Sequence, residues 1–327
     1  MHELYLWPFQ DAVRAGTGSI MCSYNRINNS YGCANSKTMN GLLKTELGFQ
    51  GFVVSDWLAQ HTGVASAMSG LDMVMPDSKL WANLSMAVSN GTMPQERLND
   101  MATRILATYI KLGNKPNTLG GGIPASLTAP HKWVNVRSPA SASAILQGAM
   151  EGHVLVKNTN NALPLGGNPK LISLFGYDAT APRSNNVADA NWNLGDEPTN
   201  ITDATPIVLG AAEPPGIAIN GTLSVGGGSG ANTPPFIIDP FQAFQQRALQ
   251  DGSYILWDFV SAAPKVDPAS DVCVVFINVF STEGGDRPYL SDDYSDNLVN
   301  GVANQCANTM VVIHNAGKFS QHSMSDR

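Results

Sequence analysis

Short, largely apolar runs separated by helix-like segments constrain this chain most. In the first 113 residues such runs lie at 19–24, 52–55 and 71–75, and the segments between them carry apolar residues at helical spacing. Ser36 is the predicted N-cap of the helix between the first two runs. Continuous apolar runs indicate strands buried on both faces, which is typical of a parallel sheet covered by helices. The sequence therefore predicts an α/β unit.

A second series of the same kind follows a Pro-, Gly- and Ser-rich stretch at residues 114–140, which is typical of a linker. A helical pattern near 141–152 leads into the apolar run HVLVKN. Further apolar runs are LISLF, YILWDF, DVCVVFIN and MVVIH, with helical patterns between them. We therefore predict three segments, which are an α/β unit at 1–113, a linker at 114–140 and a second α/β domain at 141–327.

Composition limits the class of partner. The formal net charge is −7 and no Lys/Arg run is present, which argues against nucleic acid and anionic membrane surfaces. No apolar run approaches the roughly 20 residues of a membrane span, and the first ten residues lack the pattern of a signal peptide. We expect a neutral small molecule as partner. The sequence does not indicate an oligomeric state.

The motifs of metal and nucleotide sites are not recognisable in the sequence. The six histidines show no metal-ligand spacing, and no GxSxG motif is present. The glycine cluster VGGGSG at 225–230 lacks the Gly-Lys-Ser/Thr ending of a phosphate-binding loop, although Ser229 within it has a hydroxyl that suits a sugar. We expect neither a metal nor a cofactor.

Cysteines and glycosylation motifs bear on the compartment. Cys22 and Cys33 flank a short loop that a disulfide would close, and Cys273 and Cys306 lie beside two strands predicted to be neighbours; free thiols are the alternative for either pair. Five Asn-x-Ser/Thr motifs suit a secreted glycoprotein. They begin at Asn28, Asn83, Asn90, Asn200 and Asn220.

Two carboxylates follow predicted strands. Asp56 stands directly after the run at 52–55, where barrels and open sheets place catalytic groups; capping of the next helix is the alternative. Glu283 lies in STEGGDRPYLSD, just past the run DVCVVFINVF; a solvated turn with an Asp286–Arg287 pair is the alternative.

Several motifs in this order resemble the family-3 glycoside hydrolases. They are MCSYNRINNSYGC, GFVVSDWLAQHTGVASAMSGLDMVMP, VLVKNTNNALPL, GGGSGANTP and STEGGDR. The resemblance implies a (β/α)8 barrel followed by an α/β sandwich, with the active site between them. Residues 1–113 would be the last three β/α units of the barrel and 141–327 an incomplete sandwich, so that the chain is expected to be a fragment.

The resemblance also implies the chemistry. Asp56 would be the nucleophile and Glu283 the general acid/base of a retaining β-glucosidase acting on cellobiose, short oligosaccharides or aryl glucosides. Such double displacement needs one ionised and one protonated carboxyl about 5 Å apart. Met21 and Trp57 would line the sugar, Tyr24 would orient Asp56, and Ser229 would contact the sugar from the second domain.

Alternatives of other classes stay open at this point. One is a non-catalytic fragment with at most weak carbohydrate binding, and another is a β-xylosidase of the same family. A β-N-acetylglucosaminidase is disfavoured by the presence of Glu283, because that subgroup usually works with an Asp-His pair on a barrel loop and often lacks the second domain. The resemblance to fungal extracellular enzymes implies an extracellular location, with the secretion signal outside this sequence.

Overall fold

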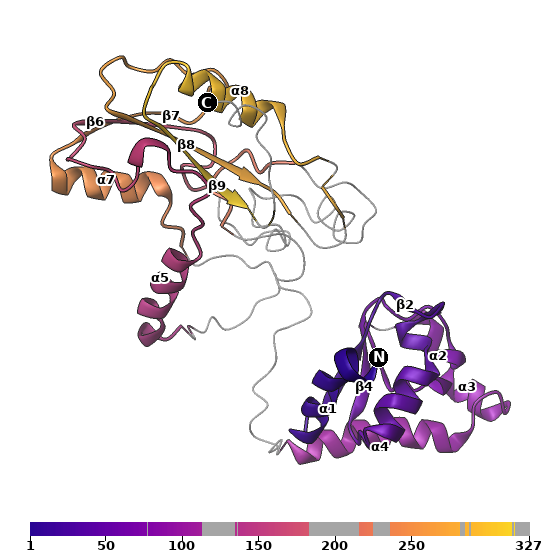
Figure 1. Ribbon diagram of the computed structural model, residues 1–327. Coiled ribbons are helices and arrows are strands. Elements are labelled where there is room, and N and C mark those ends of the chain that lie inside the picture. The colour runs from indigo at the N-terminus through magenta and orange to yellow at the C-terminus, as the bar shows by residue number, and fades with distance from the viewer. Residues whose placement is uncertain are drawn as a thin grey trace. The chain divides into compact units, whose positions relative to one another are not determined.

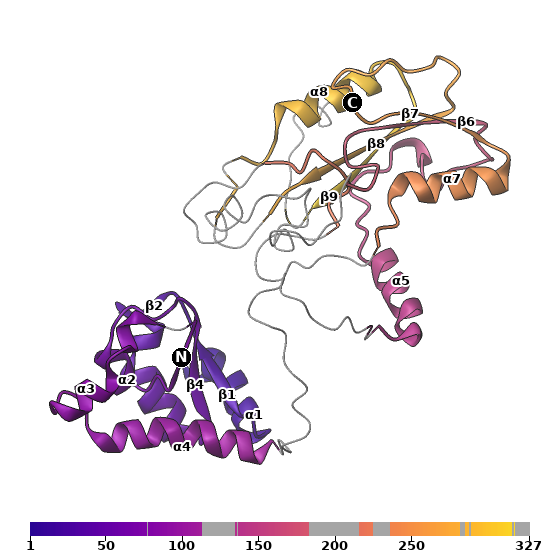
Figure 2. The ribbon, with the colours of Figure 1, turned by 180° about the vertical axis from the view of Figure 1, so that it is seen from behind.

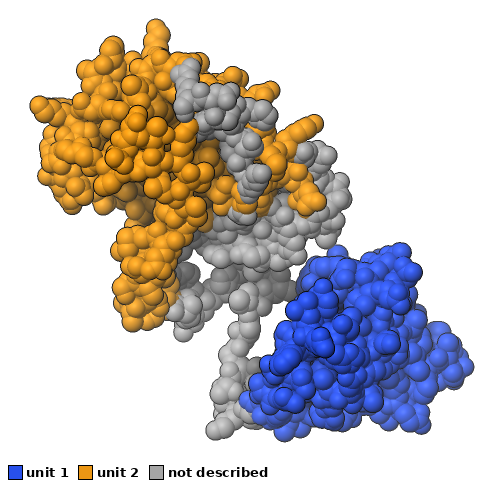
Figure 3. All heavy atoms as spheres, in the orientation of Figure 1, with its two compact units in different colours: residues 1–122 blue, residues 123–327 orange. Residues whose placement is uncertain are grey.

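The computed structural model describes residues 1–76, 78–112, 135, 137–182, 216–224, 236–281, 285–287, 289–315 and 317. The chain divides into two compact units, residues 1–122 and 123–327 (Figure 3). The division falls inside the stretch 114–140 that the sequence predicts as a linker, most of which lies outside the described residues. Each unit is therefore described by itself.

The first unit, which carries the label β4 in Figure 1, is built on a three-stranded parallel sheet with strand order β1-β4-β5. The strands are β1 (Ser19–Cys22), β4 (Phe52–Trp57) and β5 (Met73–Met75), with a small antiparallel pair of β2 (Arg26–Ile27) and β3 (Ser30–Tyr31). The helices are η1 (His2–Leu6), α1 (Trp7–Arg14), η2 (Gly32–Ala34), η3 (Lys37–Glu46), α2 (Val64–Met68), η4 (Lys79–Trp81), α3 (Leu84–Ser89) and α4 (Gln95–Lys111). The predicted parallel α/β arrangement is confirmed.

Burial of both faces of β4 explains its apolar run. Val53, Val54 and Ser55 are all buried. Val53 packs in one cluster with Met39 of η3 and with other apolar side chains. Gly51, just before β4, meets the chain at Gly18 so closely that a Cβ on Gly51 would lie 2.2 Å from the Gly18 carbonyl oxygen. The starts of β1 and β4 can therefore approach only because position 51 has no side chain.

The predicted N-cap at Ser36 is wrong. The backbone of Ser36 is already helical (φ −64°, ψ −30°), and its side chain makes no capping hydrogen bond. Asn35 is extended (φ −100°, ψ 97°), and its Oδ1 accepts a hydrogen bond from the Thr38 backbone N–H at 2.9 Å. A capping side chain needs this extended backbone in order to reach the free N–H groups of the first turn, so Asn35 rather than Ser36 caps η3.

The second unit contains a four-stranded parallel sheet in the order β7-β6-β8-β9. Its strands are β6 (Leu171–Phe175), β7 (Tyr254–Asp258), β8 (Val272–Val279) and β9 (Thr309–Asn315). The helices are η5 (Pro139–Ser141), α5 (Ala142–Glu151), η6 (Thr159–Asn161), α7 (Pro240–Asp251) and α8 (Asp293–Ala303). Figures 1 and 2 show α7 and α8 on opposite faces of this sheet.

Strand β8 is the centre of the second unit's core, since every one of its residues is buried. Alternate side chains point to opposite faces. Val275 and Ile277 pack with residues of α8 on one face, whereas Val274 and Phe276 pack against α7 on the other. A continuous apolar run is the expected signature of a strand covered on both sides.

The apolar run HVLVKN does not form a strand. Residues 153–158 follow α5 without pairing to the sheet, and Val154 and Val156 are 81% and 91% exposed. The apolar character of a run does not by itself specify a strand. For this reason the sequence pattern placed residues 153–158 among the strands of the sheet.

The strand order creates a switch point between β6 and β8. From β6 the chain passes through α7 to β7 on one side, and from β8 it passes through α8 to β9 on the other. In open parallel sheets, ligands bind beyond the carboxyl ends of the two strands at which the direction of winding reverses. The loops after β6 and β8 are therefore the functional end of this sheet.

Both cysteine pairs are disulfides. Cys22 is joined to Cys33 across the short loop, and Cys273 of β8 is joined to Cys306. The free-thiol alternative is not what the structure contains. Among the helices within the described ranges, none has the length and apolar character needed to cross a membrane.

Candidate active site

Asp56 lies at the carboxyl end of β4, the central strand of the first sheet. Its Oδ1 accepts hydrogen bonds from the Tyr24 hydroxyl at 3.1 Å and from the Trp57 backbone N–H at 2.6 Å. The next helix, α2, begins only at Val64 and has Gly63 at its N-cap. Asp56 is therefore not a helix cap, and its carboxylate is held by a tyrosine and a backbone amide at the end of the sheet where loops converge.

Three of the predicted substrate-contacting side chains gather near this carboxylate. Met21 is paired with Val54 in the parallel register of β1 and β4, and the regular pairing of these strands ends at Cys22 and Ser55, one residue before Asp56. Met21 is 51% exposed, Tyr24 45% and Trp57 55%. Large apolar groups beside a polar carboxylate suit a ligand that has both an apolar face and hydroxyl groups.

The end of β4 is fixed to β5 by side-chain and strained backbone contacts. Ser55, fully buried, accepts a hydrogen bond from the Met75 backbone N–H at 2.8 Å. Leu58 has φ of +64° and donates its N–H to the Met75 carbonyl at 2.9 Å. A bulky residue in this left-handed region is strained, and such strain is typical of functional sites. Ser55 is not predicted from the sequence, where its only signal is that a polar residue stands within an apolar run.

A cross-linked loop carries Tyr24. The Cys22–Cys33 disulfide closes this loop at the carboxyl end of β1. Asn35, two residues beyond the loop, donates a hydrogen bond from Nδ2 to the Ile27 carbonyl inside it at 2.9 Å. Tyr31 stacks on His61, five residues beyond Asp56, with ring centroids 3.9 Å apart. The loop is therefore anchored on both sides of the position from which Tyr24 reaches Asp56.

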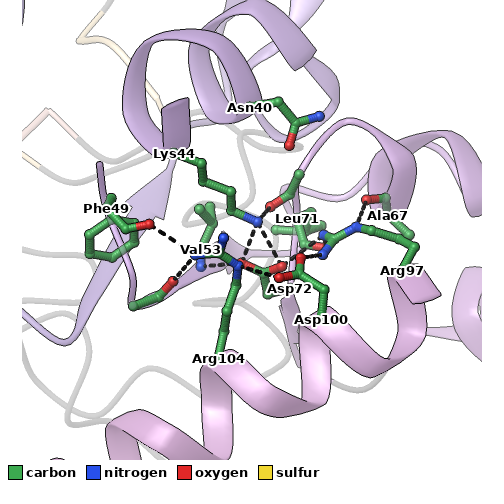
Figure 4. Close-up of polar contacts among 12 residues, drawn as sticks. Asn40, Lys44, Phe49, Val53, Ala67, Leu71, Asp72, Arg97, Asp100 and Arg104 are labelled. Carbon is green, nitrogen blue, oxygen red and sulfur yellow. Dashed lines mark hydrogen bonds and ion pairs between the residues drawn. The ribbon is translucent and has the colours of Figure 1, made fainter. Parts of the chain in front are cut away.

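A buried ion cluster lies at the amino ends of the same strands (Figure 4). The Asp72 side chain is 0% exposed and contacts Lys44 Nζ at 2.8 Å and Arg97 Nη2 at 2.7 Å. Asp72 also accepts the Val53 backbone N–H at 2.8 Å, which ties the cluster to β4. Arg97 also forms an ion pair with Asp100, which forms a second ion pair with Arg104.

The charges of Asp72, Lys44 and Arg97 are largely buried and paired with one another. Burial lowers the pKa of Lys44 to about 8, although its hydrogen bond and charge pairing with Asp72 act in the opposite direction. In parallel α/β barrels the amino ends of the strands serve stability, whereas the carboxyl ends carry chemistry. The cluster around Asp72 therefore supports the sheet that presents Asp56.

The second unit carries the other predicted site residues. Glu283 and Ser229 both lie outside the described residues. The strand that leads to Glu283 is described as far as its end, where Phe280 is fully buried and Ser281 is half-buried. Within the described ranges, no group of three or more His, Cys, Asp or Glu side chains is arranged to hold a metal ion.

Comparison with known families identifies both units. Residues 1–108 match the glycosyl hydrolase family 3 N-terminal domain, and residues 153–325 match the family 3 C-terminal domain. The chain belongs to glycoside hydrolase family 3. The family predicted from the sequence motifs is thereby confirmed.

Fungal family-3 proteins are similar to this chain over nearly its whole length. It is 55% identical to a probable beta-glucosidase M from Aspergillus niger, across 97% of this chain and 39% of that protein. It is 50% identical to the beta-glucosidase cel3A of Pyricularia oryzae, across 97% of this chain and 41% of that protein. The chain thus spans about two fifths of the length of these relatives.

Solved family-3 structures have the same fold. A family-3 beta-glucosidase from Neurospora crassa matches 100% of this chain and 40% of its own, with a TM-score of 0.72 and 37% identity. A Chaetomium thermophilum beta-glucosidase matches with a TM-score of 0.73 and 38% identity, again over 100% of this chain and 40% of its own. These likenesses confirm the predicted fold class, which is part of a barrel followed by an α/β sandwich domain.

Proposed function

We propose that this chain carries the catalytic residues of a retaining β-glucosidase, which removes terminal non-reducing β-D-glucosyl residues from cellobiose, short oligosaccharides or aryl glucosides. The observation that carries the proposal is the carboxylate of Asp56, held by Tyr24 and the Trp57 N–H at the carboxyl end of β4. Its relatives, 50–55% identical, are named as beta-glucosidases.

The reaction has two displacement steps. In the first, Asp56 attacks the anomeric carbon, and Glu283 transfers its proton to the departing glycosidic oxygen. In the second, Glu283 takes a proton from water, whose oxygen attacks the same carbon and releases Asp56 as a carboxylate. No electron acceptor or metal is required, because the two carboxyl groups balance every proton.

The geometry around Asp56 suits the role of nucleophile. The hydrogen bonds from Tyr24 and from the Trp57 N–H both end on Oδ1. They orient the carboxylate, and we assign the attack to Oδ2. Trp57 and Met21 supply exposed apolar surface for the C–H face of the sugar. Ser229 is proposed as a hydroxyl ligand from the second unit.

Replacing Tyr24 with phenylalanine tests the orienting hydrogen bond. The ring stays but the hydroxyl that donates to Asp56 is lost, and we expect kcat to fall roughly 10- to 100-fold, the loss of one hydrogen bond to a charged group. Steady-state kinetics with an aryl β-glucoside measures the effect. A Tyr24→Phe variant with unchanged kcat would contradict the orienting role.

Replacing Glu283 with alanine tests the general acid. We expect kcat/KM for cellobiose to fall roughly 10²- to 10⁴-fold, the usual size of general-acid catalysis. For an aryl glucoside with a very acidic phenol, kcat/KM should fall much less than for cellobiose, because that leaving group departs in the first step without a proton. Asp286→Ala, three residues further along the same loop, is the control. A loss of equal size with both substrates would contradict the assignment.

We also propose that the protein is extracellular and glycosylated. Both disulfides require an oxidising compartment to persist. The described members of the five glycosylation motifs are all exposed, whereas Asn200 lies outside the described residues. The exposed ones are Asn28, Asn83, Asn90 and Asn220. Mass shift on enzymatic deglycosylation of the secreted protein tests this proposal.

A further inference from the structure

A buried polar network occupies the switch point of the second sheet. Asp178, just beyond β6, has a fully buried side chain. Its Oδ1 accepts hydrogen bonds from Asn278 Nδ2 and from the Leu223 backbone N–H, each at 2.7 Å. Its Oδ2 pairs with His314 Nδ1 on β9, and this hydrogen bond raises the pKa of His314.

Asn278 connects this network to a segment remote in sequence. Its Oδ1 accepts the Ala218 backbone N–H at 2.8 Å, and its Nδ2 donates to the Ala218 carbonyl at 2.8 Å. Just beyond the end of β8, the Phe280 N–H donates to the Gly216 carbonyl at 3.1 Å. A side-chain amide can satisfy both backbone groups of one residue at once, as a neighbouring strand would. Segment 216–224 is thus fixed to the end of β8.

Apolar packing reinforces the same junction. Phe280 is 0% exposed and forms a small core with Ala218 and Leu223. Thr222 donates its hydroxyl to the Asp178 carbonyl at 2.8 Å, so that the segment is bound to the loop after β6 as well as to the end of β8. The three segments are consequently held together by both apolar packing and hydrogen bonds.

The location of this junction relates it to two loops of the proposed active site. Leu223 precedes Ser229 by six residues (229 − 223), and Phe280 precedes Glu283 by three (283 − 280). One network therefore fixes the points from which both loops start. A loop residue a few positions from a rigid anchor is confined to a small region, and small misplacements of a catalytic group are costly.

Stability alone does not explain the polar character of the junction. Asp178 and Asn278 stand at the end of strands whose other side chains are almost all apolar. Well-packed apolar residues usually stabilise a buried site at least as well as a charged one. Polar groups with directional bonds, however, specify one arrangement of the connected backbone segments.

We propose that Asp178 and Asn278 are positioning residues for glycoside hydrolysis, because they hold in place the starts of the two loops that carry Glu283 and Ser229. The expected effect on hydrolysis rests on the proposed function, whereas the hydrogen-bond network does not depend on it. His314 completes the network by holding the second oxygen of Asp178.

Amide hydrogen exchange tests the network without reference to activity. In the 327-residue chain with Asn278→Ala, the Ala218 and Leu223 amides should exchange at least about 10-fold faster, since each loses or weakens its buried acceptor. Asp178→Asn keeps the size of the side chain and serves if Asn278→Ala does not fold. Asp271→Asn is the matched control, because Asp271 accepts the Lys170 and Leu171 N–H groups at the opposite end of the same strands. Unchanged exchange at 218 and 223 would overturn the network.

Leaving-group dependence tests the positioning role. In Asn278→Ala, kcat/KM for cellobiose should fall about 10- to 100-fold, part of the contribution of a general acid, and for an aryl glucoside with a very acidic phenol by less than about 3-fold. Val302→Ala removes buried core volume on α8 and should affect both substrates equally. An equal loss for both substrates in Asn278→Ala would overturn the positioning of Glu283. An unsubstituted chain that exchanges as expected but hydrolyses neither substrate would count against the proposed function instead.

Discussion

An Asp56→Ala variant is expected to lose essentially all hydrolysis of an aryl β-glucoside, with kcat reduced roughly 10⁴-fold or more, as for removal of other enzymatic nucleophiles. Without the carboxylate, no covalent glycosyl intermediate forms. The nearby Tyr24 hydroxyl and Trp57 N–H remain, but they have no group to orient. Initial-rate measurements at saturating substrate provide the test.

The control for this variant is Glu96→Ala, which removes an exposed carboxylate from the first turn of α4. It should retain the parent rate. An Asp56→Ala protein that folds normally and keeps more than about a hundredth of the parent rate would contradict the assignment, because a residual rate this high requires another nucleophile.

An Asp72→Asn variant is expected to lose about 3–5 kcal/mol of the stability of the first unit, the usual result of breaking a buried ion pair. Lys44 and Arg97 then remain buried beside a neutral amide. Hydrogen exchange of β4 amides as a function of urea reports the first unit separately from the second. Because the second unit contains none of these residues, its exchange should not change.

Lys44→Met is the matched control for Asp72→Asn. It leaves Asp72 paired with Arg97 at 2.7 Å and removes a cation whose pKa is already lowered to about 8 by burial. The change in stability should be no more than about 1 kcal/mol, because an apolar side chain replaces a charge that is costly to bury. Equal losses in the two variants would show that Asp72 does not hold β4 and that loss of packing explains both.

The architecture was predictable because parallel strands buried on both faces leave continuous apolar runs. The runs at 52–55 and 171–175 correspond to β4 (Phe52–Trp57) and β6 (Leu171–Phe175). Asp56 was recognisable for the same reason, since a carboxylate directly after such a run must lie at a strand end. The family motifs then gave its proposed role.

What the sequence did not reveal depends on contacts between distant residues. Asp178 and His314 are 136 residues apart, and Asn278 and Ala218 are 60 apart. Nothing local distinguishes Asn278 from any other polar residue near a strand end. The helix cap was predicted one residue too late, at Ser36 instead of Asn35. These residues are neighbours, but which of them caps the helix depends on backbone angles that the local sequence does not specify. A polar residue inside an apolar run, such as Ser55, is the one sequence signal that would have indicated a buried side-chain hydrogen bond near the site.

The most direct test of the central claim is to trap the covalent intermediate. An aryl 2-deoxy-2-fluoro-β-glucoside reacts with the enzyme to form the glycosyl intermediate, which is then hydrolysed slowly. The fluorine destabilises the positively charged transition states of both steps, and the good aryl leaving group keeps the first step faster than the second. Peptide mass spectrometry of the treated protein should find one fluoroglucosyl group on the peptide that contains Asp56, and fragmentation should assign the group to Asp56. A label on another carboxylate, or full turnover of a glucoside with no labelled peptide, would contradict the account.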